Sequence, residues 1–427
     1  MTAYWCENIW LPDGVAQGVT VHAEDGLITK VSTEDVGAER LSGMVFPGFA
    51  NAHSHAFHRA LRGRTHADGG TFWTWRDAMY ALAATLDPDS YLTLARAVYA
   101  EMALAGITSV GEFHYLHHAP GGRPYDDPNA MGHALHQAAA DAGIRITLLD
   151  TLYLTGGLDG EPLNETQQRF SDGDLDRWWS RAGTLDGWAL HSVRAVPAEY
   201  LRPFAELTRG GVVHVHLSEQ PAENEACLAR HGCTPTELLH RHGVLRDNLT
   251  AVHATHLSTE DIHLLGGNQV TACFCPTTEG DLADGIGPAR ELVDAGSTLC
   301  LGSDQHVVID MFTEARALEH GERLRTGRRG RFTPAELTAA MTGHAALGRP
   351  GGAIAPGWPA DLVAVRMDTP RTAGSAPGQV MLAASAADIH TVISDGTPIV
   401  RDGVHSTLGD VGRLLHDAIT EVWEAAR

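Results

Sequence analysis

The chain has 427 residues, 43% hydrophobic and 20% charged, and its formal net charge at pH 7 is −22. This length can bury a large core, and the excess of negative charge disfavours nucleic acid or an anionic membrane as a partner, because both require a dense basic surface. No apolar run approaches the roughly 18 residues of a membrane-spanning helix, and the first residues lack a basic segment followed by an apolar one. We therefore expect a cytoplasmic protein.

The first 44 residues predict short antiparallel strands, separated by turns at the PDG and EDG tripeptides. From residue 45 to residue 304, short β-rich runs alternate with helical segments such as 88–105 and 310–323, which is typical of βα units and a parallel sheet. Eight strands are expected, near residues 45–53, 108–114, 145–152, 187–193, 211–217, 249–254, 269–275 and 298–303. Eight such units predict an α/β fold of the (β/α)8 barrel type.

Two further segments, 117–128 and 275–287, are rich in glycine, proline and acidic residues and are expected to form long loops after strands. The tail returns to short strands and ends in an amphipathic helix. We expect a composite β-sandwich built from both termini, with residues 1–45 and 351–427 flanking a barrel of residues 46–350.

Polar side chains of the metal-ligand type stand at or near the ends of three predicted strands. His53 and His55 lie two residues apart on an extended segment, so both imidazoles point to one side. His216 and Asp304 follow the apolar runs of later strands. Because the carboxyl ends of barrel strands meet at one face, these four residues predict a single metal site. Imidazole and carboxylate ligands with one open position suit a catalytic zinc ion, and iron or manganese is also compatible.

Spacing alone does not decide between His214 and His216 as the ligand, because the two point to the same side of the strand. Glu219 favours His216, since it follows by three residues and could serve as a proton shuttle. A solvent-exposed loop glutamate is the simpler alternative. His253 should point into the barrel mouth and His256 into the next loop, although a core or capping histidine fits the same pattern.

The order VFPGFANAHSH, HLSE, VHATHL and LGSD, followed by GGAIAPGWPADLVAV, resembles the amidohydrolase superfamily over nearly the whole chain. Further motifs are similar to its formimidoylglutamate deiminase branch: AHSHAFHRALRG, TFWTWRDAMY, VGEFHYLHH, HSVRAV, CPTTEGDLADG and GSDQHV. That resemblance implies hydrolysis of N-formimidoyl-L-glutamate to N-formyl-L-glutamate and ammonia in histidine degradation. It also implies a homodimer with one zinc ion per subunit.

The resemblance assigns roles to individual residues. It implies zinc ligands at His53, His55, His216 and Asp304, and it makes Glu219, His253 and Asp304 the catalytic residues. The substrate carboxylates would be bound by Arg76, Tyr115, His191 and Arg194. His58 stands where this branch usually has glutamine, so a substrate contact there must differ. Independently of the resemblance, a dianionic substrate in so acidic a protein needs guanidinium groups, although Arg76 and Arg194 could equally be surface arginines paired with acids.

Lys30 is the only lysine in the chain, and it precedes the predicted barrel. A carboxylated lysine on a barrel strand, which bridges two metals in many amidohydrolases, therefore cannot form. This favours one metal ion, although glutamate or cysteine bridges remain open. A deaminase of the same superfamily acting on a purine, a pyrimidine or another aromatic amine is the alternative function. A barrel that has lost catalysis would be expected to lack a ligand or the shuttle.

Overall fold

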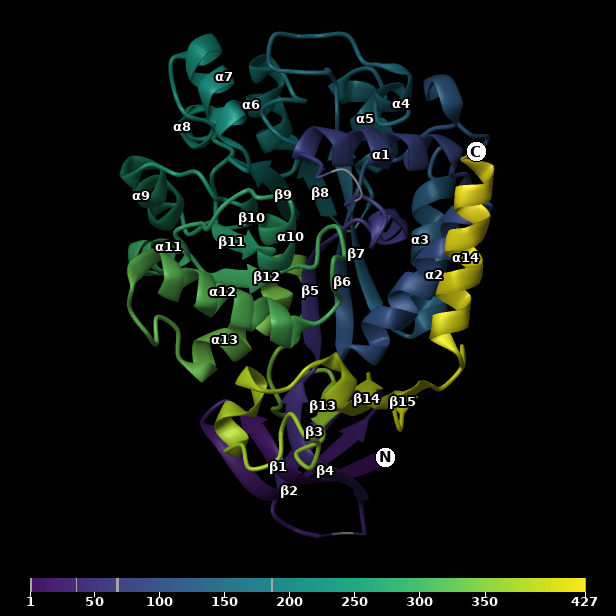
Figure 1. Ribbon diagram of the computed structural model, residues 1–427, viewed down its shortest axis with the longest axis vertical. Helices are drawn as coiled ribbons and strands as arrows, with labels where there is room; N and C mark the ends of the chain where they lie inside the picture. Colours follow the sequence, from purple (N-terminus) through teal and green to yellow (C-terminus); the bar gives the residue numbers. More distant parts are fainter. Residues whose placement is uncertain (1, 36, 67–68, 186, 427) are drawn as a thin grey trace.

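The computed structural model describes residues 2–35, 37–66, 69–185 and 187–426. Within these residues, one sheet holds eight parallel strands in chain order around a barrel, which confirms the predicted fold class. In Figure 1 the barrel occupies the upper part of the molecule and a second sheet lies below it. The barrel strands are β5 (Phe49–Ser54), β6 (Ile107–His114), β7 (Arg145–Leu152), β8 (Gly187–Leu190), β9 (Val212–Leu217), β10 (Leu249–His253), β11 (Thr271–Phe274) and β12 (Leu299–Leu301).

The first and last barrel strands are joined just beyond the end of β12. The backbone N–H groups of Ser303 and Asp304 donate to the carbonyl of His53 at 3.1 and 3.0 Å, and His55 N–H donates to the carbonyl of Asp304 at 3.3 Å. Closure of the sheet therefore takes place at the segments that carry the candidate metal ligands.

The expected strand at 45–53 is two strands in the structure. β4 (Glu39–Pro47) belongs to the second sheet, and β5 begins at Phe49. A Cβ on Gly48, between them, would lie 2.3 Å from Thr108 Oγ1 and 2.7 Å from Asp361 Cβ. Glycine thus permits the close passage between the sheets, and the continuous apolar run hides this break from sequence reasoning.

The second sheet has the strand order β16-β15-β14-β13-β4-β1-β2-β3 and is antiparallel apart from the pairing of β1 with β4. β13 pairs with β4, so both ends of the chain build this sheet, as expected. Its other strands are β1 (Thr2–Leu11), β2 (Gly14–Glu24), β3 (Leu27–Ser32), β13 (Leu362–Val365), β14 (Ile389–Ser394), β15 (Thr397–Arg401) and β16 (Val404–His405).

Helices surround the barrel and follow its strands in the chain (Figure 1). α2 (Pro88–Leu104) begins after a capping box in which Asp87 and Ser90 exchange hydrogen bonds, with proline at the first helical position. Among the described residues, no helix combines the length and apolar composition needed to cross a bilayer. The remaining helices of the barrel region are α1 (Phe72–Thr85), α3 (Ala130–Ala142), α4 (Glu165–Gln168), α5 (Leu175–Ala182), α6 (Ala198–Leu207), α7 (Pro221–His231), α8 (Pro235–Arg241), α9 (Thr259–Gly267), α10 (Pro276–Asp281), α11 (Ala289–Ala295), α12 (Met311–Thr326) and α13 (Pro334–Met341).

The terminal helix α14 (Val411–Ala425) lies along α2, on the side of the barrel (Figure 1). Trp423 Nε1 donates to the carbonyl of Ala60 at 2.8 Å, in the short 3-10 helix that follows β5. The tail thus returns to the barrel, although the expected unit 351–427 grouped it with the sheet. The expected boundary at residue 45 likewise falls inside β4, and the division into 1–45, 46–350 and 351–427 stays a prediction.

Candidate active site

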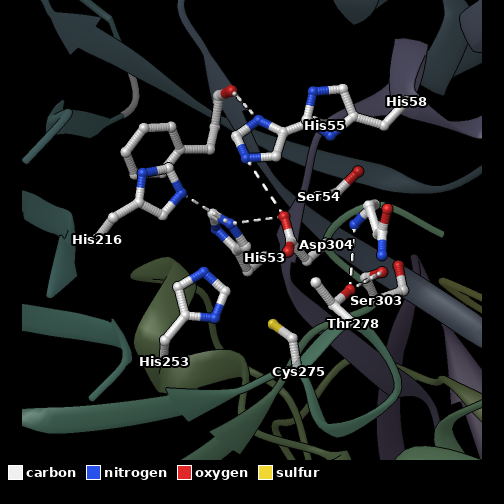
Figure 2. A network of polar contacts seen from close by, with 12 residues as sticks. His53, Ser54, His55, His58, His216, His253, Cys275, Thr278, Ser303 and Asp304 are labelled. Carbon is white, nitrogen blue, oxygen red and sulfur yellow. Dashed lines mark hydrogen bonds and ion pairs between the residues drawn. The ribbon is translucent and has the colours of Figure 1, made fainter. Parts of the chain in front are cut away.

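Four histidines and one aspartate meet at the carboxyl ends of the barrel strands (Figure 2). His53 Nε2 and His55 Nε2 lie 3.3 and 3.4 Å from the same carboxylate oxygen, Asp304 Oδ1. His216 Nε2 lies 3.2 Å from His53 Nε2. Two sets of donor atoms each fall within 4.8 Å of one another, one from His53, His55 and Asp304 and one from His53, His216 and His253. Because His53 belongs to both sets, the side chains form one cluster.

The hydrogen bonds of two imidazoles indicate which ring nitrogen is unprotonated and directs its lone pair into the cluster. His55 Nδ1 lies 2.9 Å from the carbonyl oxygen of Phe113, and His216 Nδ1 lies 3.0 Å from that of His191. A carbonyl only accepts, so each Nδ1 must donate and each neutral ring presents an unprotonated Nε2. Those lone pairs point at Asp304 Oδ1 and at His53 Nε2. A carboxylate oxygen only accepts, so the lone pair of His55 and Asp304 repel each other, and a cation between them would replace this repulsion with coordination.

Burial favours the neutral imidazoles that metal binding requires. Desolvation, followed by the neighbouring His53, lowers the pKa of His55 to about 3, and desolvation also lowers the pKa of His216 well below its usual value. His53 is fully buried, and its pKa is lowered for the same reason. The donor set of neutral nitrogens and one carboxylate therefore fits a divalent metal such as zinc.

His214 lies two residues before His216 on β9, and its side chain contacts a group outside the cluster. Its Nε2 lies 2.8 Å from the carbonyl oxygen of Ala346, and it belongs to neither set of donor atoms in the cluster. The structure thus places His216, and not His214, beside His53. The sequence left this choice open because the two side chains share one face of the strand.

His253 lies between two buried carboxylates. Its Nε2 is 3.7 Å from Glu219 Oε1, and its Nδ1 is 3.5 Å from Glu279 Oε1. Burial alone would lower the pKa of His253, but these carboxylates outweigh it and raise the pKa to about 10. These carboxylates therefore favour the protonated ring next to the predicted proton shuttle. His256, by contrast, contacts the carbonyl of Asp284 in the following loop, at 2.7 Å.

Several residues at the barrel mouth adopt left-handed backbone conformations that are rare for residues other than glycine. The φ angles are +50° at Ser218, +69° at His253, +47° at Ala254 and +40° at Asp304. Such strain persists only where the surrounding structure enforces it, and it is concentrated at functional sites. Here it coincides with the turns that bring Glu219, His253 and Asp304 together.

A buried network fixes the strand ends that carry the ligands. Glu112 on β6 accepts from Ser54 Oγ and from Ala56 N–H, both at 2.6 Å, on either side of His55. Asn51 donates to Ser303 Oγ at 2.7 Å, next to Asp304. Desolvation raises the pKa of Glu112 to about 7. Sequence reasoning missed Glu112, Asn51 and Ser303 because each resembles an ordinary residue of an apolar strand.

A cavity of about 340 Å³ opens over this cluster. Its walls include every residue expected to bind substrate, namely His58, Arg76, Tyr115, His191 and Arg194. It is also lined by Glu219 and by the cluster residues His55, His216, His253 and Asp304. The predicted substrate residues and the predicted catalytic residues therefore share one cavity.

The two arginines of the cavity differ in their partners. The guanidinium of Arg76 lies over the Trp73 ring at 4.4 Å and the Tyr80 ring at 5.6 Å, and its buried Nε has no hydrogen-bond partner. Arg194 lies 2.9 Å from Glu223 and 3.5 Å from Glu219. Arg76 can thus receive an anion directly, whereas Arg194 also constrains Glu219, the predicted proton shuttle.

His58 contacts Tyr115 within the cavity wall. Its Nε2 lies 2.9 Å from the Tyr115 hydroxyl, and its buried Nδ1 has no hydrogen-bond partner. His191 contributes twice, since its ring lines the cavity and its carbonyl accepts from His216. Its position directly after β8, which ends at Leu190, explains both roles.

The segment 275–287 is not the continuous loop that its composition suggested, because it contains α10. It supplies two buried carboxylates near the cluster that were not expected as site residues. Glu279 contacts His253, and one oxygen each of Glu219 and Asp284 and a nitrogen of His253 lie within 4.8 Å of one another. The CPTTEGDLADG motif was the only signal, and it does not say where these carboxylates point.

Known proteins are similar to this chain in sequence and in fold. The model of the amidohydrolase family matches residues 44–399. A formimidoylglutamate deiminase of Pseudomonas aeruginosa is 36% identical, covering 95% of this chain and 96% of the relative. An 8-oxoguanine deaminase of the same organism is 30% identical, covering 87% and 85%. The crystal structure of an amidohydrolase from Brucella melitensis has a TM-score of 0.90 at 31% identity, covering 99% and 100%. The chain therefore belongs to the amidohydrolase family and is a deaminase-type hydrolase of carbon–nitrogen bonds.

Proposed function

We propose that this protein hydrolyses N-formimidoyl-L-glutamate to N-formyl-L-glutamate and ammonia, a step of histidine degradation. The observation that carries the proposal is the pair of guanidinium groups, Arg76 and Arg194, in the cavity that contains the metal-type cluster. The substrate has two carboxylates, and planar guanidinium groups bind carboxylates through paired hydrogen bonds. The similarity to the Pseudomonas aeruginosa formimidoylglutamate deiminase supports the same substrate.

The proposal includes one zinc ion per subunit, held by His53, His55, His216 and Asp304. The lone-pair arrangement of these side chains supports the ligand set. Lys30 lies in β3 of the second sheet, where it pairs with Glu34 at 2.9 Å, so it is not available as a metal bridge. When bound, zinc lowers the pKa of a water molecule and polarises the carbon that is attacked. Iron or manganese would provide similar chemistry, and metal analysis of the purified protein distinguishes the three.

Three side chains move or hold protons in the proposed reaction. Asp304 accepts a proton from the attacking water, which adds to the formimidoyl carbon. The cationic His253 orients that water through Nε2–H. Glu219, close to His253 and to the cavity, delivers a proton to the nitrogen that leaves as ammonia. The proton held by Asp304 then passes to the same nitrogen, and the hydroxyl proton of the adduct returns to Glu219. The carbon–nitrogen bond breaks as the new carbonyl forms, so ammonia leaves and both carboxyl groups regain their starting protonation.

The other cavity residues are proposed to hold the glutamate part of the substrate. Arg76 binds one carboxylate against the ring of Trp73, and Arg194 binds the other while it stays paired with Glu223. Tyr115 and His191 donate further hydrogen bonds. His58 supports the hydroxyl of Tyr115 and so replaces, in part, the glutamine that relatives usually have.

The decisive experiment measures ammonia release from N-formimidoyl-L-glutamate beside guanine, cytosine and adenosine analogues. We expect kcat/KM for formimidoylglutamate to exceed the others by several orders of magnitude, because the arginines favour a dianion. Comparable or better turnover of an aromatic amine would replace this substrate with the alternative, a purine or pyrimidine deaminase. The aromatic rings near Arg76 would then serve for stacking on the base.

The proposed enzyme is a homodimer and is located in the cytoplasm. The resemblance to formimidoylglutamate deiminases supports a homodimer, which light scattering of the purified protein would detect as twice the monomer mass. A cytoplasmic location agrees with a small anionic substrate from amino-acid breakdown, and fractionation of cells checks it. All six cysteines are free and buried, which is compatible with a reducing compartment.

A further inference from the structure

The CPTTEGDLADG segment brings a buried carboxylate to the far side of His253, where the proposed reaction does not use it. Glu279 Oε1 is in ion-pair contact with His253 Nδ1 at 3.5 Å, and this buried nitrogen has no hydrogen-bond partner, while His253 Nε2 faces Glu219 at 3.7 Å. We propose that Glu279 is a positioning residue that fixes the imidazole of His253 through Nδ1 and so aims Nε2 at the reacting centre. This inference rests on the proposed role of His253, and it gives a function to Glu279, which the proposed reaction does not use.

Glu279 is itself rigidly placed. It is 4% exposed, and its Oε1 accepts from the backbone N–H of Cys275 at 2.9 Å, at the start of α10. The helix is anchored from outside by Glu314, which accepts from Thr277 N–H at 3.0 Å and from the Thr277 hydroxyl. In the described part of the chain, His253 is the basic side chain recorded in ion-pair contact with Glu279. The carboxylate is thus free of competing cations and can act on one imidazole.

The imidazole needs such a partner because the ring that stacks on it does not set its orientation. The ring of His216 stacks on it at 5.6 Å and 20°, and this packing is satisfied equally by a ring turned over by half a rotation. Such a turn would exchange the ring's nitrogen and carbon atoms and move Nε2 away from Glu219. A fixed acceptor opposite Nδ1 favours one of the two orientations, as carboxylates do for histidines in many active sites.

Replacement of Glu279 tests this role. Glu279→Gln keeps an acceptor for Cys275 N–H but loses the charge, and Glu279→Ala loses both. We expect kcat to fall by about tenfold in the glutamine variant and about a hundredfold in the alanine variant, in the range known for such outer partners. KM and zinc content should stay close to wild type, because neither the substrate residues nor the ligands change.

Glu314→Gln is the matched control, because Glu314 is an equally buried carboxylate that braces α10 without contacting His253. It should leave kcat near the wild-type value. An equal fall of kcat in Glu314→Gln and Glu279→Gln would overturn the proposal in favour of general loosening of α10. A full wild-type kcat in Glu279→Ala would also overturn it.

A double-mutant cycle then asks whether Glu279 acts through His253. In a His253→Ala background, Glu279→Gln should cause no further loss of kcat, whereas independent effects would multiply and contradict the proposal. A readout without turnover is the downfield proton resonance of an imidazole N–H bonded to a carboxylate. We expect it in the wild-type protein and its loss in both Glu279→Gln and His253→Ala, and its persistence in Glu279→Gln would count against the pair.

These results remain distinct from a failure of the proposed substrate. The cycle is run on whichever amine or amidine the wild-type enzyme deaminates best. Wild-type inactivity on formimidoylglutamate with turnover of another amine overturns the substrate alone. Normal turnover of formimidoylglutamate by Glu279→Ala overturns the positioning role alone.

Discussion

Three imidazoles in the cluster differ in the group that their second nitrogen contacts. Backbone carbonyls accept from Nδ1 of His55 and His216, so these rings are neutral and suited to bind a metal, while carboxylates on both sides favour the protonated form of His253. One residue type therefore serves two chemistries within a few ångströms. The difference is set by long-range contacts, which is why residue type and spacing in the sequence could nominate these histidines but not separate their roles.

Glu219→Gln tests the proposed role of Glu219 as the proton shuttle. The amide has the shape of the carboxylate but cannot gain and lose a proton in each turnover, so we expect kcat to fall by roughly 10²- to 10⁴-fold. Zinc content should be unchanged, because Glu219 is not among the proposed ligands. Steady-state kinetics and metal analysis of the same preparation measure both. Turnover like that of wild type would assign the shuttle to another group.

Arg76→Met and Arg194→Met separate binding from catalysis. Arg76 meets no carboxylate of the protein in any ion pair recorded for the described residues, so its loss should raise KM by about 10- to 100-fold with little change in kcat, as expected for a charged hydrogen bond. Arg194 also contacts Glu219, so its loss should raise KM and lower kcat together. An unchanged KM in both variants would mean that the carboxylates bind elsewhere. A formamidine without carboxylates is the control, since its KM should not respond to Arg76→Met.

At the scale of elements, the alternation of apolar runs and helical segments predicted the barrel strands, because period and length carry that information. The end of the first strand was predictable, but its beginning was not, since the run from Val45 to Ala50 is apolar on both sides of Gly48. The loop expected at 275–287 contains α10, whose helix starts at Pro276. Local composition did not predict this helix, since turn-forming residues surround a segment that tertiary contacts with Glu314 stabilise.

A buried ion pair joins α5 to β7, and its removal is expected to lower the free energy of unfolding. Arg181 on α5 pairs with Asp150 on β7 at 2.6 Å and with Asp172 at 2.7 Å. Arg181 and Asp150 are buried, and the side chain of Asp172 is 8% exposed. Arg181→Met would leave two carboxylates without their cation, so we expect unfolding to become easier by about 3–5 kcal/mol in urea titrations. Arg177→Met on the same helix is the control, because this exposed arginine, paired with Asp174 at 3.4 Å, should contribute less than about 1 kcal/mol. A loss below 1 kcal/mol for Arg181→Met would show that water or nearby histidines replace the ion pair.

For the molecule as a whole, the formal charge of −22 counts every carboxyl group as ionised. Burial contradicts this count at several sites. Desolvation raises the pKa of Glu112 to about 7 and that of Glu314 to about 8. Both side chains are fully buried, so the folded protein carries protons near neutral pH that the unfolded chain releases. Its stability must therefore depend on pH through groups that no sequence count distinguishes from surface acids.

The pH dependence of stability can be tested at Glu314. Its pKa in the folded protein, about 8, lies above the value of about 4.3 expected for an unfolded chain, so the folded state binds the extra proton between these values. Stability from this group is complete below about pH 4.3 and declines as the pH rises toward 8. Glutamine does not titrate, so Glu314→Gln should gain stability relative to wild type between pH 5 and pH 8, by at least about 1 kcal/mol. Urea unfolding of both proteins at the two pH values, with equal zinc, measures this difference. Glu199→Gln, an exposed substitution on α6, should show no such change, and a constant difference for Glu314→Gln would mean that Glu314 is ionised in the folded protein.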